Sequence, residues 1–154
     1  MKKILVPLIS QKNSYTCGYA CIRMVCEYFG IHLTERQVVK ACGISDGELE
    51  MHGLPNLRVA ISLRQLGVKC TQKKNCTIAQ LTKIAGVKPA IIAYTGRKNK
   101  WGHFAVLTGI DQNKLIFNDP ISGRDFSLAI SDFNKRWKSA YEKSDRWMCV
   151  ATEK

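Results

Sequence analysis

The sequence predicts an α+β fold, with an N-terminal helical part packed on a C-terminal antiparallel sheet. Apolar residues recur at the three- and four-residue spacing of helices in the first half of the chain, whereas strand-like apolar runs dominate the second half. Helices followed by strands is the order of an α+β fold. The length of 154 residues and the apolar fraction of 45% suit one globular domain covering residues 1–154.

Each helix predicted in the first half has a local start or stop signal. Gly30 ends the first helix, and Thr34 with Gln37 forms a capping box that begins the second. The third carries Pro55 in its first turn, where a backbone N–H has no helical partner in any case. The polar, acidic stretch 44–53 is predicted to be a loop. The predicted helices cover residues 17–29, 34–42 and 54–66.

The second half is predicted to consist mainly of strands that form the antiparallel sheet. A hairpin turn at residues 111–114 joins two of them, and Thr77 begins a short helix with a second capping box. A further short helix is expected over residues 131–137. The predicted strands cover residues 68–71, 89–94, 103–110, 114–118, 124–127 and 147–151.

The formal net charge of +12 is the unusual feature of the composition. Such a charge could attract nucleic acid, an acidic protein or a membrane surface. The basic residues are scattered, however, and their densest cluster, residues 97–100, has no nucleic-acid-binding motif around it. We therefore expect a solvated basic surface and no nucleic-acid partner. No apolar run approaches the roughly 20 residues of a membrane helix and no signal peptide is recognisable, so a cytoplasmic protein is expected.

Seven cysteines are an odd number for a disulfide framework. The pair Cys17 and Cys21 is not followed by a second pair of metal ligands, so neither a zinc site nor a cofactor is predicted. Mostly buried thiols in a reducing compartment are the simpler interpretation. The cysteines are Cys17, Cys21, Cys26, Cys42, Cys70, Cys76 and Cys149.

Cys17 has the most suggestive setting for chemistry. It lies in the first turn of the first predicted helix, where free amides and the helix dipole favour a thiolate, and Gly18 allows close approach of a neighbouring backbone. Its position alone also fits a half-buried structural thiol. Gln11, six residues earlier, is a candidate oxyanion donor together with the backbone N–H of Cys17, and is otherwise a surface residue.

A nucleophilic cysteine needs a base, and the chain has three histidines, His32, His52 and His103. His103 begins a predicted strand, where a ring can be held firmly at the edge of a cleft, although it could equally be a structural histidine. Asp119 ends the strand that pairs with the His103 strand, so its carboxylate is expected near the ring and could fix the tautomer. Asp119 could otherwise only begin a turn before Pro120.

Four segments of the chain occur in an order that resembles one known family. Residues 11–21, followed by Tyr28-Phe29-Gly30, resemble the opening of that family, and residues 102–107 resemble its histidine strand. Residues 118–123 resemble its Asp-Pro-x-x-Gly turn, and residues 126–137 its closing helix. The family is that of the bacteriocin-processing peptidases, usually found as the N-terminal domain of peptidase-containing ABC transporters.

The resemblance implies a papain-like cysteine peptidase fold. The family cleaves leader peptides after a Gly-Gly pair, because a narrow channel excludes side chains next to the scissile bond; Gly-Ala is the expected variation. Upstream apolar residues of the leader helix would dock in a separate groove. The implied roles are those of nucleophile for Cys17, general base and acid for His103, orienting carboxylate for Asp119 and oxyanion donor for Gln11.

Two departures from the family pattern bear on the substrate and context. Thr16 stands where the family commonly has an acidic residue, and the tail 138–154 is more basic than the usual lead into a transporter's first membrane helix. Neither changes the implied catalytic residues.

Three functions from different classes are therefore considered. The first is a leader peptidase, whose partners would be a peptide or protein with a Gly-Gly site and a parent transporter. The second is an antibacterial toxin domain with the same chemistry, delivered into the cytoplasm of a target cell and neutralised by an acidic immunity protein; the high basic charge favours it. The third is a non-catalytic peptide-binding module, against which the presence of both Cys17 and His103 argues.

Overall fold

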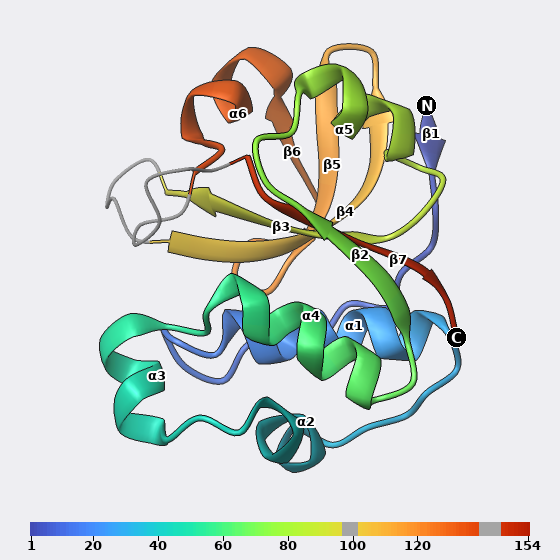
Figure 1. Cartoon of the computed structure of the whole chain (residues 1–154). Helices are drawn as coiled ribbons and strands as arrows, with labels where there is room; N and C mark the ends of the chain where they lie inside the picture. The colour runs from blue at the N-terminus through green and yellow to red at the C-terminus, as the bar shows by residue number, and fades with distance from the viewer. Residues whose placement is uncertain (97–101, 139–145) are drawn as a thin grey trace.

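The computed structural model describes residues 1–96, 102–138 and 146–154. Its helices are α1 (Cys17–Tyr28), α2 (Glu35–Cys42), α3 (Asp46–His52), α4 (Asn56–Gln65), α5 (Ile78–Ile84) and α6 (Ile130–Arg136). Its strands are β1 (Lys2–Lys3), β2 (Lys69–Lys73), β3 (Ala90–Thr95), β4 (Gly102–Asp111), β5 (Lys114–Asp119), β6 (Gly123–Ala129) and β7 (Met148–Glu153). Helices α1 to α4 lie together below a curved antiparallel sheet, and α5 and α6 lie above it (Figure 1). The predicted α+β class, with an N-terminal helical part on a C-terminal sheet, is confirmed.

Local signals begin α2 and α5 where the sequence predicted, whereas Pro55 precedes α4 as its N-cap and does not lie in its first turn. At the start of α2, Thr34 Oγ1 accepts a hydrogen bond from the N–H of Gln37, whose side chain accepts from the N–H of Thr34. The same reciprocal pair, Thr77 and Gln80, begins α5. Gly43 ends α2 with φ +63°, a left-handed conformation that glycine adopts without strain.

The stretch 44–53 is not a loop throughout, so this prediction is wrong. Helix α3 occupies seven of its residues, and Ser45 Oγ caps it by accepting from the N–H of Glu48 at 3.2 Å. Leu49 is the one buried residue of α3, so the sequence contains no apolar periodicity there. Capping rather than an apolar face defines this helix. The short strand β1, which pairs with β4, was likewise not predicted.

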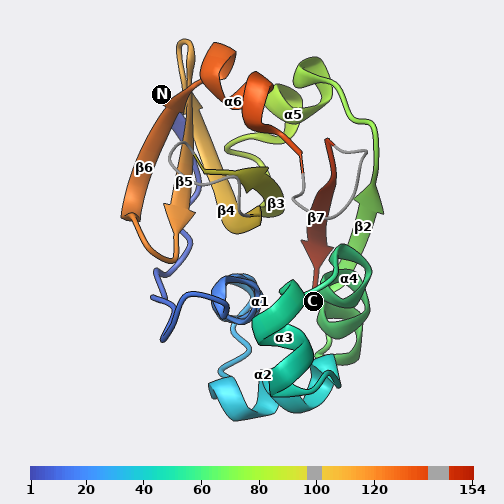
Figure 2. The ribbon, with the colours of Figure 1, turned by 90° about the vertical axis from the view of Figure 1, so that its left-hand side faces the viewer.

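The order of the strands in the sheet differs from their order in the chain. Within the described residues, seven strands run in the order β2-β7-β3-β4-β5-β6, with β1 added against β4. The last strand, β7, therefore inserts between β2 and β3, and Figure 2 shows it beside β2. Strands β4 and β5 form the expected hairpin, whose turn contains Gln112 at φ +53°. In the β3–β4 pair, Tyr94 is the register partner of His103.

The central strands are buried on both faces, because helices cover both sides of the sheet and side chains alternate between its faces along each strand. On β3, Ile91 joins the core shared with α1, α2 and α4. Its neighbours Ile92 and Tyr94 belong to the second core, under α5 and α6. All seven cysteines are buried free thiols, as predicted. The reducing compartment inferred from them stays a prediction.

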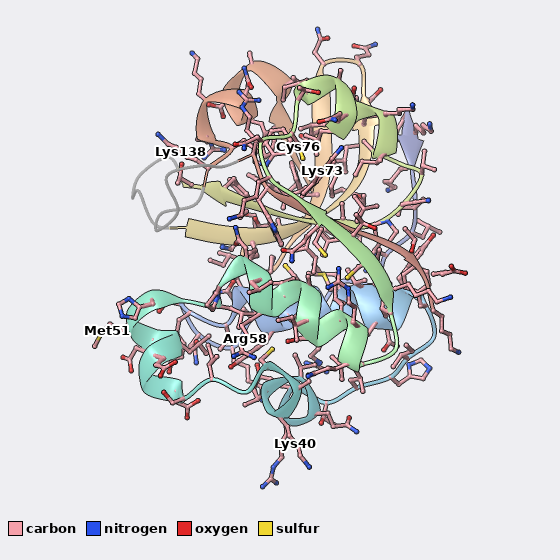
Figure 3. The ribbon with its side chains drawn as sticks, in the orientation of Figure 1. Lys40, Met51, Arg58, Lys73, Cys76 and Lys138 are labelled. Atoms are coloured by element: carbon pink, nitrogen blue, oxygen red, sulfur yellow. The ribbon has the colours of Figure 1, made fainter. Side chains whose placement is uncertain are left out.

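Exposed side chains, both polar and apolar, project from the outside of the helical group. Lys40 extends from α2 away from the rest of the molecule, and Met51 projects from α3 (Figure 3). Among the described residues, no helix is long and apolar enough to cross a membrane. The basic cluster at residues 97–100 lies outside the described residues, as does the segment 139–145 of the basic tail.

Candidate active site

A cleft of about 1070 Å³ lies between the helical group and the sheet. One wall comes from the start of α1 and from the connection between α3 and α4. The other comes from β3, β4, β6 and α6. Three of the four predicted site residues, Cys17, His103 and Asp119, line this cleft.

Cys17 is the first residue of α1, and the start of this helix is open. Thr16 occupies the N-cap position but makes no side-chain cap. Its Oγ1 instead accepts hydrogen bonds from the N–H groups of Lys12 and Asn13, each at 3.2 Å. The first-turn amides of α1 therefore have no intrahelical acceptor, and the helix dipole places partial positive charge beside Sγ of Cys17. Thr16 holds the preceding loop and leaves the helix start available to an anion.

Gly18 is needed for packing next to Cys17. A Cβ atom at this position would lie 2.8 Å from Cδ2 of Leu54 and 3.4 Å from Cδ2 of Phe104. Both side chains also line the cleft. The connection between α3 and α4 is therefore held directly against the start of α1. The atoms that approach Gly18 belong to side chains, and not to a neighbouring backbone as the sequence predicted.

The structure brings His103 and Asp119 together. The Nε2 atom of His103 lies 3.0 Å from both carboxylate oxygens of Asp119. This contact follows from the β4–β5 hairpin, which places the end of β5 beside the start of β4. Because Nε2 faces Asp119, Nδ1 is the ring nitrogen left for the thiol of Cys17, which lines the same cleft.

Asp119 is 1% exposed and its carboxylate is surrounded by donors. Oδ1 accepts from the N–H groups of Ile121 at 2.8 Å and Ser122 at 2.9 Å. Oδ2 accepts from the hydroxyl of Tyr94 at 2.6 Å. The two roles considered for Asp119, beginning a turn and contacting the histidine, therefore occur together in one side chain.

These contacts favour a negative charge on Asp119 and a positive charge on His103. Burial by itself raises the pKa of Asp119, but the hydrogen bond and positive charge of His103, with donors from Tyr94 and Ser122, lower it to about 2. Burial acts to lower the pKa of His103, but hydrogen bonds to Asp119 and Cys17 and their negative charges raise it to about 10. At neutral pH the site therefore holds a carboxylate beside an imidazolium.

Protonation of Asp119 at acid pH is expected to lower the free energy of unfolding. Because its pKa of about 2 in the folded protein lies below the ordinary value of 3.8, Asp119 contributes stability that is present above 3.8 and lost as the pH falls through 2. The Tm difference between the wild type and Asp119→Asn, which cannot titrate, should be largest near about pH 5 and shrink towards about pH 2. Thermal unfolding at a series of pH values measures this. A pH-independent difference would contradict the assignment.

The side chain of Gln11 is bonded within its own loop in this structure. Its backbone N–H donates to the carbonyl of Pro120 at 3.1 Å, so the loop before α1 is tied to the turn that follows Asp119. Its side-chain Nε2 donates to the carbonyl of Asn13 at 2.6 Å, and its Oε1 is buried without a partner among the described residues. Gln11 lines a smaller hollow next to the cleft. Its oxyanion role stays a prediction.

The remaining candidates from the sequence lie elsewhere. His32 is exposed and its Nδ1 lies 2.6 Å from Oε1 of Glu27, outside the cleft. His52 ends α3 and lines the cleft on the helical side. Tyr94, which the sequence analysis did not single out, contacts Asp119 directly. The signal available for it was a tyrosine at the end of a buried strand, since a buried phenol usually has a hydrogen-bond partner.

The fold and the cleft define the class of protein. The cleft holds the thiol of Cys17 at an open helix start and the ring of His103, which the buried carboxylate of Asp119 orients. This arrangement is suited to acyl transfer through a cysteine. The class is that of the cysteine peptidases. Residues 5–141 match the model of the peptidase C39 family, and the chain belongs to this family.

The chain is similar in sequence to parts of two larger transport proteins. The colicin V secretion/processing ATP-binding protein of Escherichia coli is 26% identical over 127 residues, which is 77% of this chain and 15% of that protein. The lactococcin-G-processing and transport ATP-binding protein of Lactococcus lactis subsp. lactis is 24% identical over 137 residues, 89% of this chain and 18% of that protein. The chain thus spans less than a fifth of the length of these relatives.

A solved structure supports the fold. The crystal structure of a double glycine motif protease from an AMS/PCAT transporter, in complex with the leader peptide, aligns with a TM-score of 0.78 at 24% identity. The alignment covers 99% of this chain and 95% of that chain. The papain-like fold expected from the resemblance is confirmed, and the comparisons give no support to the toxin alternative.

Proposed function

We propose that this chain is a leader peptidase that cleaves after a Gly-Gly or Gly-Ala pair. The observation that carries the proposal is the shared cleft of Cys17, His103 and Asp119, in which an open helix start and an oriented ring meet. Its substrate would be a peptide with a leader, and its context a parent ABC transporter, as the names of the relatives suggest. We further propose that residues 1–154 form one peptidase domain.

The first half of the reaction forms an acyl-enzyme. The thiolate of Cys17 attacks the carbonyl carbon of the scissile bond, so an S–C bond forms and the carbonyl oxygen becomes an oxyanion. As the C–N bond breaks, His103 gives its Nδ1 proton to the leaving nitrogen, which departs as a neutral amine. Asp119 keeps the ring in place and stabilises its charge, without itself taking a proton.

The second half releases the leader. A water molecule attacks the thioester carbon and gives a proton to Nδ1 of His103. The S–C bond then breaks, which leaves a carboxylic acid on the leader and restores the thiolate of Cys17 beside the imidazolium. Oxygen and proton counts balance, because one water supplies the hydroxyl of the acid and one proton.

The oxyanion would lie at the start of α1. The N–H of Cys17 is a first-turn amide without an intrahelical acceptor, so it is free to donate. Gln11 would be the second donor. One hydrogen of its Nε2 is bonded to Asn13 in the free protein, so the other hydrogen, or a turn of the amide, would serve the oxyanion.

The preference for glycine has a steric basis beside the nucleophile. Leu54 and Phe104 come from opposite halves of the fold, and both approach the position where Gly18 lacks a side chain. The passage next to Cys17 is therefore bounded by two large apolar side chains. A peptide without side chains at the scissile bond would fit there, whereas a bulky residue would push the carbonyl away from Sγ.

Cleavage of synthetic peptides tests this function. A peptide with a Gly-Gly site should be cut after the second glycine, and replacing that glycine by valine, leucine or phenylalanine should lower kcat/KM by about 100-fold, since a displacement of about 1 Å can cost that much. Replacement by alanine should be tolerated. Mass spectrometry of the products gives the new termini, and a peptide substituted well upstream of the site is the control. Comparable cleavage after bulky residues would refute the proposed specificity.

A further inference from the structure

Tyr94 makes the shortest hydrogen bond to Asp119. Its hydroxyl donates to Oδ2 at 2.6 Å, whereas the backbone donors to Oδ1 lie at 2.8 and 2.9 Å and Nε2 of His103 lies at 3.0 Å. Tyr94 is 4% exposed and Asp119 is 1% exposed, so this bond is shielded from bulk water. A hydrogen bond to a buried carboxylate is strong for that reason.

The ring of Tyr94 is fixed from several sides. It meets the ring of His103 edge-on, with centroids 5.5 Å apart and an interplanar angle of 82°. It stacks on Phe117 at 6.0 Å, and the guanidinium carbon of Arg136 lies 5.5 Å from its centroid. These contacts leave the hydroxyl little freedom to point away from Asp119.

The phenol of Tyr94 stays protonated over the working pH range. Burial, followed by the charge of Asp119 and the hydrogen bond to it, raises the pKa of Tyr94 well above the ordinary value of 10.0, while the charge of Arg136 acts in the opposite direction. Tyr94 is therefore a permanent donor to Oδ2. The nearby guanidinium polarises the hydroxyl and strengthens this donor.

Tyr94 and His103 compete for the same carboxylate. The Nε2–H of His103 is shared between the two oxygens of Asp119, and Tyr94 is the other donor to Oδ2 among the described residues. The more strongly Asp119 attracts the Nε2–H, the more basic the ring becomes and the less readily it gives up its Nδ1 proton. A donor that takes part of the carboxylate's charge has the opposite effect.

We propose that Tyr94 is a positioning residue for the peptidase reaction, which holds Oδ2 of Asp119 and limits its attraction for His103, so that His103 can release its Nδ1 proton to the leaving amine. The inference rests on the proposed function, because it concerns the proton that this function requires. The hydroxyl of Tyr94 acts through Asp119 and touches no reacting atom in this scheme.

Several titratable groups face His103 or line the same cleft, and any of them could affect its proton. Of these, Tyr94 is the one that is placed to adjust Asp119 without contacting Cys17. The groups are Tyr15, Cys17 of α1, Glu50 and His52 of α3, Tyr94 of β3, Asp119 of β5 and Arg136 of α6. Cys21 of α1 does not line the cleft, but its charge would act on Tyr94.

Tyr94→Phe tests the proposal, because it keeps the ring and removes only the hydroxyl. We expect kcat for peptide cleavage to fall about 10-fold with KM unchanged, and the alkaline limb of the pH profile to move up by about half a pH unit. Alkylation of Cys17 by iodoacetamide near neutral pH should keep its wild-type rate, because the imidazolium is still present. A structural defect would instead lower cleavage and alkylation together.

Tyr19→Phe is the matched control. Tyr19 is also a buried tyrosine, but its hydroxyl has no hydrogen-bond partner among the described residues, so cleavage and its pH profile should not change. Arg136→Gln provides a second variant in case Tyr94→Phe does not fold. It leaves the hydroxyl in place and weakens it as a donor, so the alkaline limb should move in the same direction by a smaller amount.

Titration of the His103 ring by NMR separates this proposal from the proposed function. The chain has three histidines, so the ring signals are few, and the pKa of His103 should rise in Tyr94→Phe whether or not a substrate is known. If the wild type cleaves no Gly-Gly peptide but this rise occurs, the proposed function fails and the role of Tyr94 in setting the ring's acidity stands. An unchanged or lowered pKa of His103 would overturn the inference.

Discussion

Replacing Cys17 by alanine is expected to abolish peptide cleavage. Removal of Sγ leaves no atom that can form the acyl-enzyme, and neither His103 nor Asp119 can substitute for it at the start of α1. The loss of kcat should be on the order of 10,000-fold or more, because members of a catalytic group act as a unit. Product formation from a Gly-Gly peptide, followed by mass spectrometry, measures this. Retained activity in Cys17→Ala would refute the mechanism.

Two other buried cysteines serve as controls for this variant. Cys21 lies one turn further along α1 and is fully buried. Burial, followed by the charges of Cys17 and Asp119, raises its pKa well above the ordinary value, so it stays a neutral thiol. Cys21→Ala and Cys149→Ala should each reduce stability by about 1 kcal/mol through lost packing, and should keep cleavage activity.

Replacing His103 by alanine is expected to slow alkylation of Cys17 strongly. An unassisted cysteine has a pKa of about 8.5, so only about 0.3% is thiolate at pH 6. Burial acts to lower the pKa of His103, but its hydrogen bonds to Asp119 and Cys17 raise it to about 10. In the wild type the ring is therefore an imidazolium at pH 6 and carries a positive charge in the cleft that also holds the thiol. The alkylation rate with iodoacetamide near pH 6 should therefore fall about 100-fold in His103→Ala.

The controls for this experiment use the other members of the site. His32→Ala removes an exposed histidine outside the cleft and should leave the alkylation rate unchanged. Asp119→Asn keeps the ring but misorients it, so turnover should be impaired without being erased. A wild-type alkylation profile in His103→Ala would mean that another group is the partner of Cys17.

Much of the fold was predictable because its signals are local. The capping boxes at Thr34 and Thr77 begin helices where the sequence places them, and Gly43 ends α2 as expected. Helix α3 was missed because it has few local signals. With Leu49 as its one buried residue, that helix has no apolar face, and only the cap at Ser45 marks it.

The part of the site that was predictable is the pair of residues that the β4–β5 hairpin brings together. His103 and Asp119 lie 16 positions apart in the chain, and the hairpin between β4 and β5 is enough to bring them together. Tyr94 is different, because its contact with Asp119 requires that β3 lie on the other side of β4. Gln11 shows the same limit, since its backbone N–H is bonded to the carbonyl of Pro120, far away in the chain, and this contact positions its loop.

The sequence by itself determined the α+β class and the capped helices α2 and α5, because capping and periodicity depend on neighbours in the chain. The residues that could carry cysteine peptidase chemistry followed from four sequence segments that resemble the bacteriocin-processing peptidases. The tertiary structure alone decided the insertion of β7 between β2 and β3, the meeting of Leu54 with Gly18, and the hydrogen bond from Tyr94 to Asp119. Each of these joins segments far apart in the chain, and their pairing is set by which buried surfaces and polar groups satisfy one another once the whole core has formed.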